Sequence, residues 1–350
     1  MSFLQSSKRL LFRGAEIAGV SSLFLSSKWR RSRLLILCYH GISLADEHEW
    51  NPGLYITADR FRKRLQNLKD RDCTVLGLGE AVERLYSNAL PPRSVVLTFD
   101  DGFYDFYSLA WPILKQFEWP ATVYLTTYYS QFESPVFDPM CSYLIWKSPK
   151  SALDWPKISP NHIPLDTGGR TKFELAVKEY CCRQGLSGRE KFDLLVELGA
   201  RLDVDVPGLS QARILHIMKP DEVSKIASEG ADVQLHMHRH RVSRNRERFW
   251  QEIDENRDCI RELTGKEPVH FCYPGGFWLR EFPDWLRQRR VVSATTCDVG
   301  MATPADDPFY LPRVLDTNLE QEVFDSWVCG VADIVSRHSV NKSEGQLLEG

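Results

Sequence analysis

The chain has 350 residues, of which 43% are hydrophobic and 11% aromatic, and its formal net charge at pH 7 is -3. This composition is that of a globular protein with a sizeable buried core, and no collagen-like or linker-like tract interrupts it. The near-neutral charge gives no reason to expect a nucleic-acid partner. The nine cysteines follow no framework spacing, which favours a reducing compartment and a cytoplasmic location.

The first 33 residues form a basic segment. Between Lys8 and Arg33, seven basic residues accompany a single acid, Glu16. The longest charge-free run, residues 17–27, is too short to span a bilayer, which needs about 20 apolar residues. We interpret residues 8–33 as an amphipathic segment that contacts the inner membrane surface peripherally. A packed or solvated helix fits equally well, and an export signal fits less well because positive charge follows the apolar run.

From residue 34 onward, short apolar runs alternate with helical patterns. Such runs are typical of strands that are buried on both faces. They lie at residues 34–39, 74–76, 95–99, 122–125, 233–236, 269–273, 292–296 and 309–314. Thr57 is a good N-cap for one intervening helix, and Pro112 predicts a kink in another over residues 106–117. The alternation stops over residues 131–218, where helical patterns and loops with aromatic residues take its place.

This alternation predicts an α/β fold, namely a (β/α) barrel with seven or eight strands and a mainly helical insertion. An open doubly wound sheet is the alternative, although no G-x-G-x-x-G phrase marks a dinucleotide site. We divide the chain into a basic N-terminal segment, a barrel in two parts, an insertion and a C-terminal tail. Their bounds are residues 1–33, 34–130 with 219–330, 131–218 and 331–350.

Polar residues follow the strands at the end where a (β/α) barrel opens. In such a barrel the C-terminal strand ends converge on one mouth. The strand-end phrases are Tyr39-His40-Gly41, Asp100-Asp101-Gly102, His236-Met237-His238-Arg239-His240, Tyr273-Pro274-Gly275-Gly276 and Leu311-Pro312-Arg313. Each phrase alone has an ordinary structural interpretation, since Asp-Asp-Gly is commonly a turn and a histidine commonly binds a backbone carbonyl.

The three histidines within five residues are harder to explain by packing, because buried unpaired imidazoles cost desolvation. His236 and His240 are four residues apart, so both can reach one ion if that stretch coils. One Asp oxygen added to two imidazoles leaves positions open for water and substrate, as in catalytic zinc sites. Asp101 can serve as a ligand while Asp100 stays free as a base, and together these residues predict hydrolysis by a metal-bound water.

The phrase Thr98-Phe-Asp-Asp-Gly102, followed by His236-x-x-x-His240, resembles the polysaccharide deacetylases of carbohydrate esterase family 4, the NodB-homology domain. The likeness covers about residues 34–130 and 219–330. Further phrases that resemble bacterial exopolysaccharide-type members lie at residues 37–42, 112–115, 119–124, 271–276 and 311–313.

The resemblance implies a distorted (β/α) barrel and an N-acetylated amino-sugar glycan as substrate. It implies that a divalent metal, zinc by preference, is held by Asp101, His236 and His240, with Asp100 as the general base. By the same resemblance, substrate contacts are assigned to Tyr273, Pro274 and Gly275.

Three departures from the family pattern affect this interpretation. Met237 stands where the family usually has Ser or Thr, and Cys272 stands where many members have the Arg that braces the base. We expect Arg313 to supply that charge from a neighbouring strand. The late L-x-H general acid is missing, and His40 and His238 are the candidates to replace it.

The sequence therefore predicts a metal-dependent hydrolase that removes N-acetyl groups from a polysaccharide or a lipid-linked glycan by attack on linear amide bonds other than peptide bonds. A deformylase of a lipid-linked formamido sugar would use the same residues. A barrel that binds glycan without turnover is the third hypothesis, and the retention of all four Asp and His residues disfavours it. In the insertion, Tyr143, Trp146 and Trp155 could stack on sugar rings or pack its own core.

Overall fold

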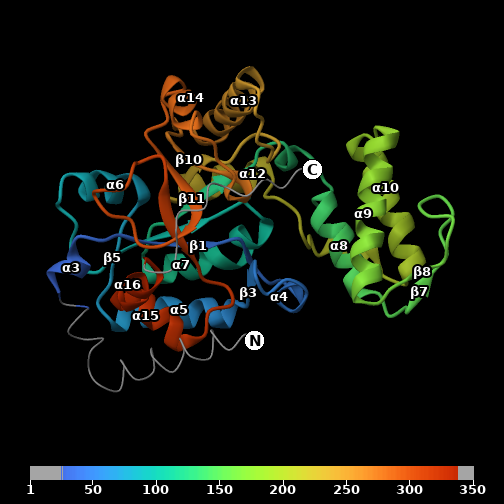
Figure 1. Cartoon of the computed structure of the whole chain (residues 1–350), viewed down its shortest axis with the longest axis horizontal. Coiled ribbons are helices and arrows are strands. Elements are labelled where there is room, and N and C mark those ends of the chain that lie inside the picture. Colours follow the sequence, from blue (N-terminus) through green and yellow to red (C-terminus); the bar gives the residue numbers. More distant parts are fainter. Residues whose placement is uncertain (1–24, 26, 338–350) are drawn as a thin grey trace.

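A closed barrel of seven parallel strands forms the centre of the molecule in this computed structural model, which describes residue 25 and residues 27–337 (Figure 1). Strand β5 pairs back with β1, which closes the barrel and confirms the predicted fold over an open sheet. A further strand, β4 (Thr74–Val75), pairs with the start of β5. Around the barrel the order is β1 (Leu35–Tyr39), β12 (Leu311–Leu315), β11 (Ser293–Val299), β10 (His270–Cys272), β9 (Asp232–Leu235), β6 (Thr122–Leu125) and β5 (Ser94–Phe99).

Helices connect most of these strands. Thr57 caps α5 as predicted, because its hydroxyl accepts the Arg60 N–H at 3.2 Å. The helix expected over residues 106–117 begins as a wide π-helical turn, η1, and continues as α7, which has Pro112 in its first turn; proline has no N–H to donate to the preceding turn. The barrel helices are α5 (Ala58–Asp70), α6 (Leu78–Tyr86), η1 (Phe106–Ala110), α7 (Trp111–Phe117), α12 (Pro220–Ser228), α13 (Arg246–Thr264), α14 (Phe282–Gln288) and α15 (Gln321–Cys329).

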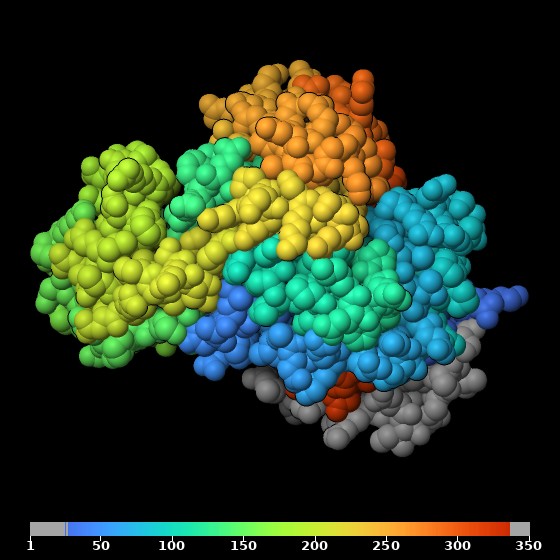
Figure 2. Space-filling model, turned by 180° about the vertical axis from the view of Figure 1, so that it is seen from behind, coloured from blue at the N-terminus to red at the C-terminus, as the bar shows by residue number. Residues whose placement is uncertain are grey.

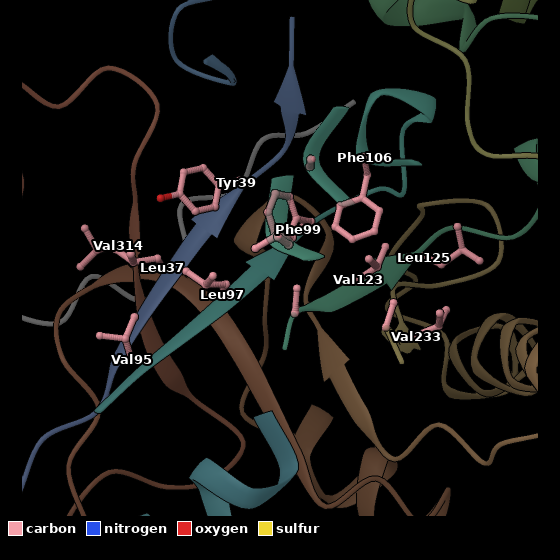
Figure 3. Packing of buried hydrophobic residues seen from close by; sticks show 14 of the residues in the cluster. Leu37, Tyr39, Val95, Leu97, Phe99, Phe106, Val123, Leu125, Val233 and Val314 are labelled. Carbon is pink, nitrogen blue, oxygen red and sulfur yellow. The ribbon is translucent and has the colours of Figure 1, made fainter. Parts of the chain in front are cut away.

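The side chains on the two faces of each barrel strand pack in different clusters, because side chains alternate along a strand. One face packs against the surrounding helices in the main core, and Figure 3 shows residues of this set from five strands: Leu37, Tyr39, Val95, Leu97, Phe99, Val123, Leu125, Val233 and Val314. The alternate residues, among them Ile36 and Val96, form a second buried cluster with Leu78 and Leu85 of α6. Helix α6 therefore closes the apolar end of the barrel interior.

The insertion between β6 and β9 forms a helical lobe beside the barrel (Figure 1). The lobe has a hydrophobic core of its own, in which Tyr143 and Trp155 are buried. These two rings therefore pack the lobe and are not free to stack on a sugar. Figure 2 shows the chain returning from the lobe across the body of the molecule. The elements of the lobe are α8 (Phe137–Lys147), β7 (Ala152–Leu153), β8 (Ile163–Pro164), α9 (Thr167–Gln184), α10 (Gly188–Leu202) and α11 (Val206–Gln211), preceded by η2 (Tyr129–Gln131).

The connection between β1 and α5 links the barrel to the lobe. It contains β2 (Gly41–Ile42), α4 (Glu47–Trp50) and β3 (Tyr55–Ile56). The rings of Trp50 and Tyr143 meet edge to face at 5.5 Å, and Asp46 binds both the Tyr143 hydroxyl and Lys147. The lobe core thus includes residues that come long before it in the chain.

Both ends of the described chain pack on the barrel. In α3 (Lys28–Arg31), Arg30 is fully buried and donates to the carbonyls of Ser94, Val328 and Arg33. Residues 331–337, expected to belong to a tail, form helix α16 (Val331–Arg337), which packs against the core. The rest of the predicted membrane-contacting segment, residues 8–24 and 26, lies outside the described residues, and membrane contact stays a prediction. Among the helices described, none has the length and apolar character that crossing a bilayer requires.

Candidate active site

The two adjacent aspartates follow β5 in a tight turn. Asp101 and Gly102 both have left-handed backbones, with φ of 70° and 82°. A Cβ atom on Gly102 would lie 2.4 Å from Leu125 Cδ1, so this position requires glycine. The Asp100 side chain is buried among groups of the barrel interior, whereas the Asp101 side chain is 17% exposed and faces two histidines. The Asp-Asp-Gly phrase is therefore a turn that also directs two carboxylates to different partners.

Asp101, His236 and His240 bring three potential metal ligands together. One atom from each lies within 4.8 Å of the others. Asp101 Oδ1 is 3.3 Å from His236 Nε2 and 3.2 Å from His240 Nε2. His236 Nδ1 lies 2.9 Å from the Cys272 carbonyl oxygen, so we assign the ring proton to Nδ1 and the free lone pair to Nε2. Metal-ligating histidines commonly make this second contact.

His240 reaches the site without the helical turn considered from the sequence. Residues 237–245 form bends and irregular chain, and both Met237 and His240 have positive φ, 63° and 55°. Each non-glycine residue in this region costs about 1–3 kcal/mol, and such strain gathers at functional sites. Met237, the departure noted above, is completely buried in the main core, so it contributes packing where a hydroxyl would have offered a hydrogen bond.

The charges of the three residues fit a cation between them. Burial opposes ionisation of Asp101, but His240 and His236 outweigh it and lower its pKa to about 2. Burial also opposes protonation of His236, but the hydrogen bond that protonated His236 donates to Asp101 and the charge of Asp100 outweigh it and raise the His236 pKa. A carboxylate and two imidazole lone pairs repel one another unless a proton or a metal ion lies between them. One carboxylate and two imidazoles are suitable ligands for such an ion.

Asp100 is held by Arg313, which reaches it from β12. Arg313 Nη1 donates to Asp100 Oδ1 at 2.7 Å and Nη2 to Oδ2 at 2.8 Å, and both side chains are buried. Burial raises the Asp100 pKa, but the guanidinium outweighs it and holds that pKa well below its usual range. Arg313 itself is oriented by the Thr296 carbonyl and the Thr98 hydroxyl. The expected charge from a neighbouring strand is thus in contact with the expected base.

Two cysteines also contact Asp100, a role that the sequence did not indicate. Cys38 Sγ lies 3.6 Å and Cys272 Sγ 3.5 Å from Asp100 Oδ2. Burial raises the pKa of both thiols well above the ordinary value, so each keeps its proton and can donate it to the carboxylate. The available signal was strand alternation, because Cys38 precedes His40 by two residues and so faces the same side of β1.

The structure separates the two candidates for the general acid. His40 Nε2 lies 3.7 Å from Asp100 Oδ2, and the His40 side chain is 17% exposed at the barrel mouth. His238 faces elsewhere: its Nδ1 lies 2.8 Å from the Thr127 hydroxyl and its Nε2 3.7 Å from Glu255. The backbone thus brings His40 to the site and turns His238 away from it.

The segment expected to contact substrate lies at the end of β10. The Tyr273 ring is fully buried between aromatic neighbours and so offers no side-chain surface to a ligand. Pro274 begins a short 3-10 turn, η3 (Pro274–Gly276), in which Gly275 and Gly276 have positive φ. Any contribution of this segment to binding would therefore come from its backbone.

Comparisons with known proteins agree with this site. The model of the polysaccharide deacetylase family matches residues 87–143 and 198–291, which include Asp100, Asp101, His236 and His240. Over these residues the chain is similar to the polysaccharide deacetylases. The matched ranges omit β1 and β12, so the contacts of His40 and Arg313 with Asp100 are known from the geometry alone.

Curated relatives share one stretch of this chain. Poly-beta-1,6-N-acetyl-D-glucosamine N-deacetylase of Escherichia coli K12 is 28% identical over 101 residues, which are 29% of this chain and 15% of the relative. The Staphylococcus epidermidis protein of the same name is 31% identical over 110 residues, which are 29% of this chain and 38% of the relative. The chain thus matches well under half of either polysaccharide deacetylase.

Solved structures share the fold over most of the chain. The Streptococcus pyogenes deacetylase PplD in complex with acetate has a TM-score of 0.55 at 18% identity, covering 83% of this chain and 95% of that one. IcaB from Ammonifex degensii has a TM-score of 0.53 at 17% identity, covering 85% and 97%. The shared fold extends over a larger part of this chain than the family model matches.

Proposed function

We propose that this protein is a metal-dependent hydrolase that removes N-acetyl groups from amino sugars of a polysaccharide or a lipid-linked glycan. The observation that carries the proposal is the convergence of Asp101, His236 and His240 beside Asp100 at the barrel mouth. The relatives named above as N-deacetylases of poly-beta-1,6-N-acetyl-D-glucosamine support this substrate class. An acetamido group is a linear amide, so its hydrolysis needs a nucleophile, stabilisation of the oxyanion and a proton for the amine.

Asp101, His236 and His240 would hold the metal, and one carboxylate with two imidazoles favours zinc. When bound, a divalent ion supplies a Lewis acid that polarises the amide carbonyl and lowers the pKa of water. The buried ion pair of Asp100 and Arg313 lies next to these three residues. Because Arg313 engages Asp100 so closely, a second cation would be repelled from the neighbouring Cys38–His40–Asp100 and Asp100–His236–Cys272 groups, which also have suitable spacing.

Asp100 would accept the proton of the attacking water. Its low pKa keeps it ionised at neutral pH, and Arg313 holds both oxygens in one orientation. Such a carboxylate is a weak base, and proton transfer to it is favourable only if the water is already acidified. His40 would then donate a proton to the departing amine, since its Nε2 lies 3.7 Å from Asp100 Oδ2 and its side chain reaches the mouth.

Two histidines on the same loop test the proposal against a matched control. In His240→Ala, bound zinc and release of acetate from N-acetylglucosamine oligomers should fall together. In His238→Ala, zinc content should stay unchanged, because His238 faces Thr127 and Glu255. Asp100→Asn should keep its zinc and lose about 10²–10⁴-fold in turnover. Metal content is measured by elemental analysis after dialysis.

Full zinc occupancy in His240→Ala would show that the trio does not bind the metal. No acetate release by the wild-type protein from N-acetylglucosamine oligomers or lipid-linked sugars would reject the proposed activity. A formamido sugar in the same panel separates deacetylation from deformylation.

A further inference from the structure

The cavity beside the loop of residues 237–245 is lined by basic side chains that the proposed chemistry does not use. It has a volume of about 280 Å³ and lies between the barrel mouth and the lobe. Arg239 and Arg241, the two neighbours of His240, form one wall, and Lys191 of α10 lies opposite. The cavity therefore adjoins a proposed metal ligand on one side and the lobe on the other.

Of the two arginines in this wall, Arg239 has carboxylate partners and Arg241 has none among the described residues. Arg239 is paired with Glu252 at 2.9 Å and Glu255 at 2.5 Å, so it is part of the protein's own ion-pair network. Arg241 is exposed and Lys191 is half-buried, and neither has a carboxylate within 4.0 Å among the described residues. The acid in the cavity wall is Asp138. Two cations without a carboxylate partner thus face a space that contains one acid.

Aromatic rings complete the wall. Phe132 is 42% exposed, and its ring centroid lies 4.9 Å from that of Tyr128. The Arg239 guanidinium lies over the other ring of this pair, 5.4 Å from the Tyr128 centroid. An exposed aromatic ring in a hollow gains free energy when a ligand covers it. Rings of this kind bind the apolar faces of sugars, whereas Arg and Lys bind carboxylates and phosphates.

We propose that this cavity binds an anionic sugar unit of the substrate, next to the unit that is deacetylated. This inference rests on the proposed function and specifies its substrate class: a glycan or lipid-linked sugar that bears a carboxylate or a phosphate group. Arg241 and Lys191 bind the charge, and Phe132 with Tyr128 covers the ring. A cavity of this volume is at the small end of ligand sites, about 300–1,000 Å³, and so holds one unit and not a long chain.

The test measures binding without turnover, in zinc-loaded Asp100→Asn protein at low ionic strength. Three probes are compared: neutral N-acetylchitotetraose, a hyaluronan tetrasaccharide that carries carboxylates, and UDP-N-acetylglucosamine, which carries phosphates. At least one anionic probe should bind about tenfold more tightly than the neutral one, because hydrogen bonds between charged groups are stronger than those between neutral groups. The probe that gains affinity identifies the anionic group as carboxylate or phosphate.

Substitutions with opposite expected signs sharpen the test. Arg241→Gln and Lys191→Gln should each remove most of the preference for the anionic probe, and Asp138→Asn should increase it. Arg244→Gln is the matched control, because Arg244 lies on the same loop, over the Phe277 ring at 5.9 Å, outside the cavity wall. Melting temperatures of all variants confirm that each has folded.

Equal affinity of the wild-type cavity for neutral and anionic probes would overturn the proposal. So would an equal loss in Arg244→Gln, since the effect would then come from the general charge of the loop. Acetate release from N-acetylchitotetraose by the unsubstituted zinc enzyme is followed in parallel. Turnover without charge preference rejects the anionic subsite alone, whereas charge preference without turnover on any probe rejects the proposed activity alone.

Discussion

The barrel mouth and the helical lobe are both well packed, but they treat polar groups differently. In the lobe, Arg170 donates to four backbone carbonyls near the ends of α8 and β8, and Asp166 and Ser187 cap helices. At the mouth, Asp101, Met237 and His240 have strained backbones, and His40 Nδ1 is buried without a partner. The polar side chains named in the lobe bond its own backbone, whereas those at the mouth face one another in an arrangement that suits a ligand.

The largest expected effect separates two arginines, the buried Arg313 at the mouth and the half-buried Arg170 in the lobe. Arg313→Met removes the cation from buried Asp100, whose pKa then rises because burial is no longer opposed. We expect activity at neutral pH to fall by about 10²–10⁴-fold and stability to fall by about 3–5 kcal/mol. The pH dependence of activity should shift upward, since Asp100 must lose its proton to act.

Arg170→Met is the counterpart in the lobe. Arg170 contacts carbonyl oxygens and no catalytic group, so we expect a loss of stability with little change in the activity of the folded fraction. Urea unfolding and acetate release on both variants make the comparison. Equal losses of activity per folded molecule would show that the lobe and the mouth are not separable in this way.

A substitution in the lobe core is expected to lower stability without lowering zinc content. Trp155→Ala removes a ring that is 1% exposed and packs against Phe173. Deleting a buried ring of this size costs about 3–5 kcal/mol. Zinc content should stay at the wild-type level, because all three proposed ligands belong to the barrel. Loss of zinc in a folded Trp155→Ala protein would mean that the lobe core helps to position the mouth.

The two buried cysteines Cys272 and Cys181 give a finer comparison. Cys272→Ala removes a donor to Asp100, while Arg313 still holds both carboxylate oxygens. A hydrogen bond is worth about 1 kcal/mol, so we expect turnover to change by about fivefold. Cys181 is buried in the lobe core, and Cys181→Ala should leave turnover unchanged. A similar change in both variants would assign the effect to packing.

The stability of the junction between the two regions is expected to depend on pH. Burial lowers the pKa of His216 to about 4, and the Leu215 and His216 carbonyls bond the N–H groups of Val136 and Tyr104. The unfolded chain, with a histidine pKa of about 6.5, binds the proton more readily than the folded one. The contribution of His216 is therefore complete above pH 6.5 and is lost as the pH falls from 6.5 toward 4.

Urea unfolding of the wild type and of His216→Gln between pH 7.5 and 4 checks this expectation. The stability of the wild type should fall more steeply with acid than that of His216→Gln. Parallel curves would show that other groups control the acid sensitivity of the junction.

Local patterns in the sequence determined the barrel strands, the irregular helix near Pro112 and the cap at Thr57. These features depend on hydrophobic periodicity and backbone chemistry, which act over a few residues. The Asp100-Asp101 and His236–His240 phrases were recognisable for the same reason, because each is contiguous in the chain. Alternation along a strand, the same local rule, also placed Cys38 and His40 on one face of β1.

Tertiary structure decided the contacts between distant segments that the sequence left open or gave only as an expectation. Arg313 and Cys272 reach Asp100 from 213 and 172 residues away because β12 and β10 both face the barrel interior. The direction of His238 depended on the path of residues 237–245, in which Met237 and His240 have positive φ, and no propensity predicts that path. The cavity lined by Arg241 and Lys191 exists only because the lobe lies beside the loop of residues 237–245. Contacts between distant segments follow from closure of the barrel, and a one-dimensional pattern does not contain that geometry.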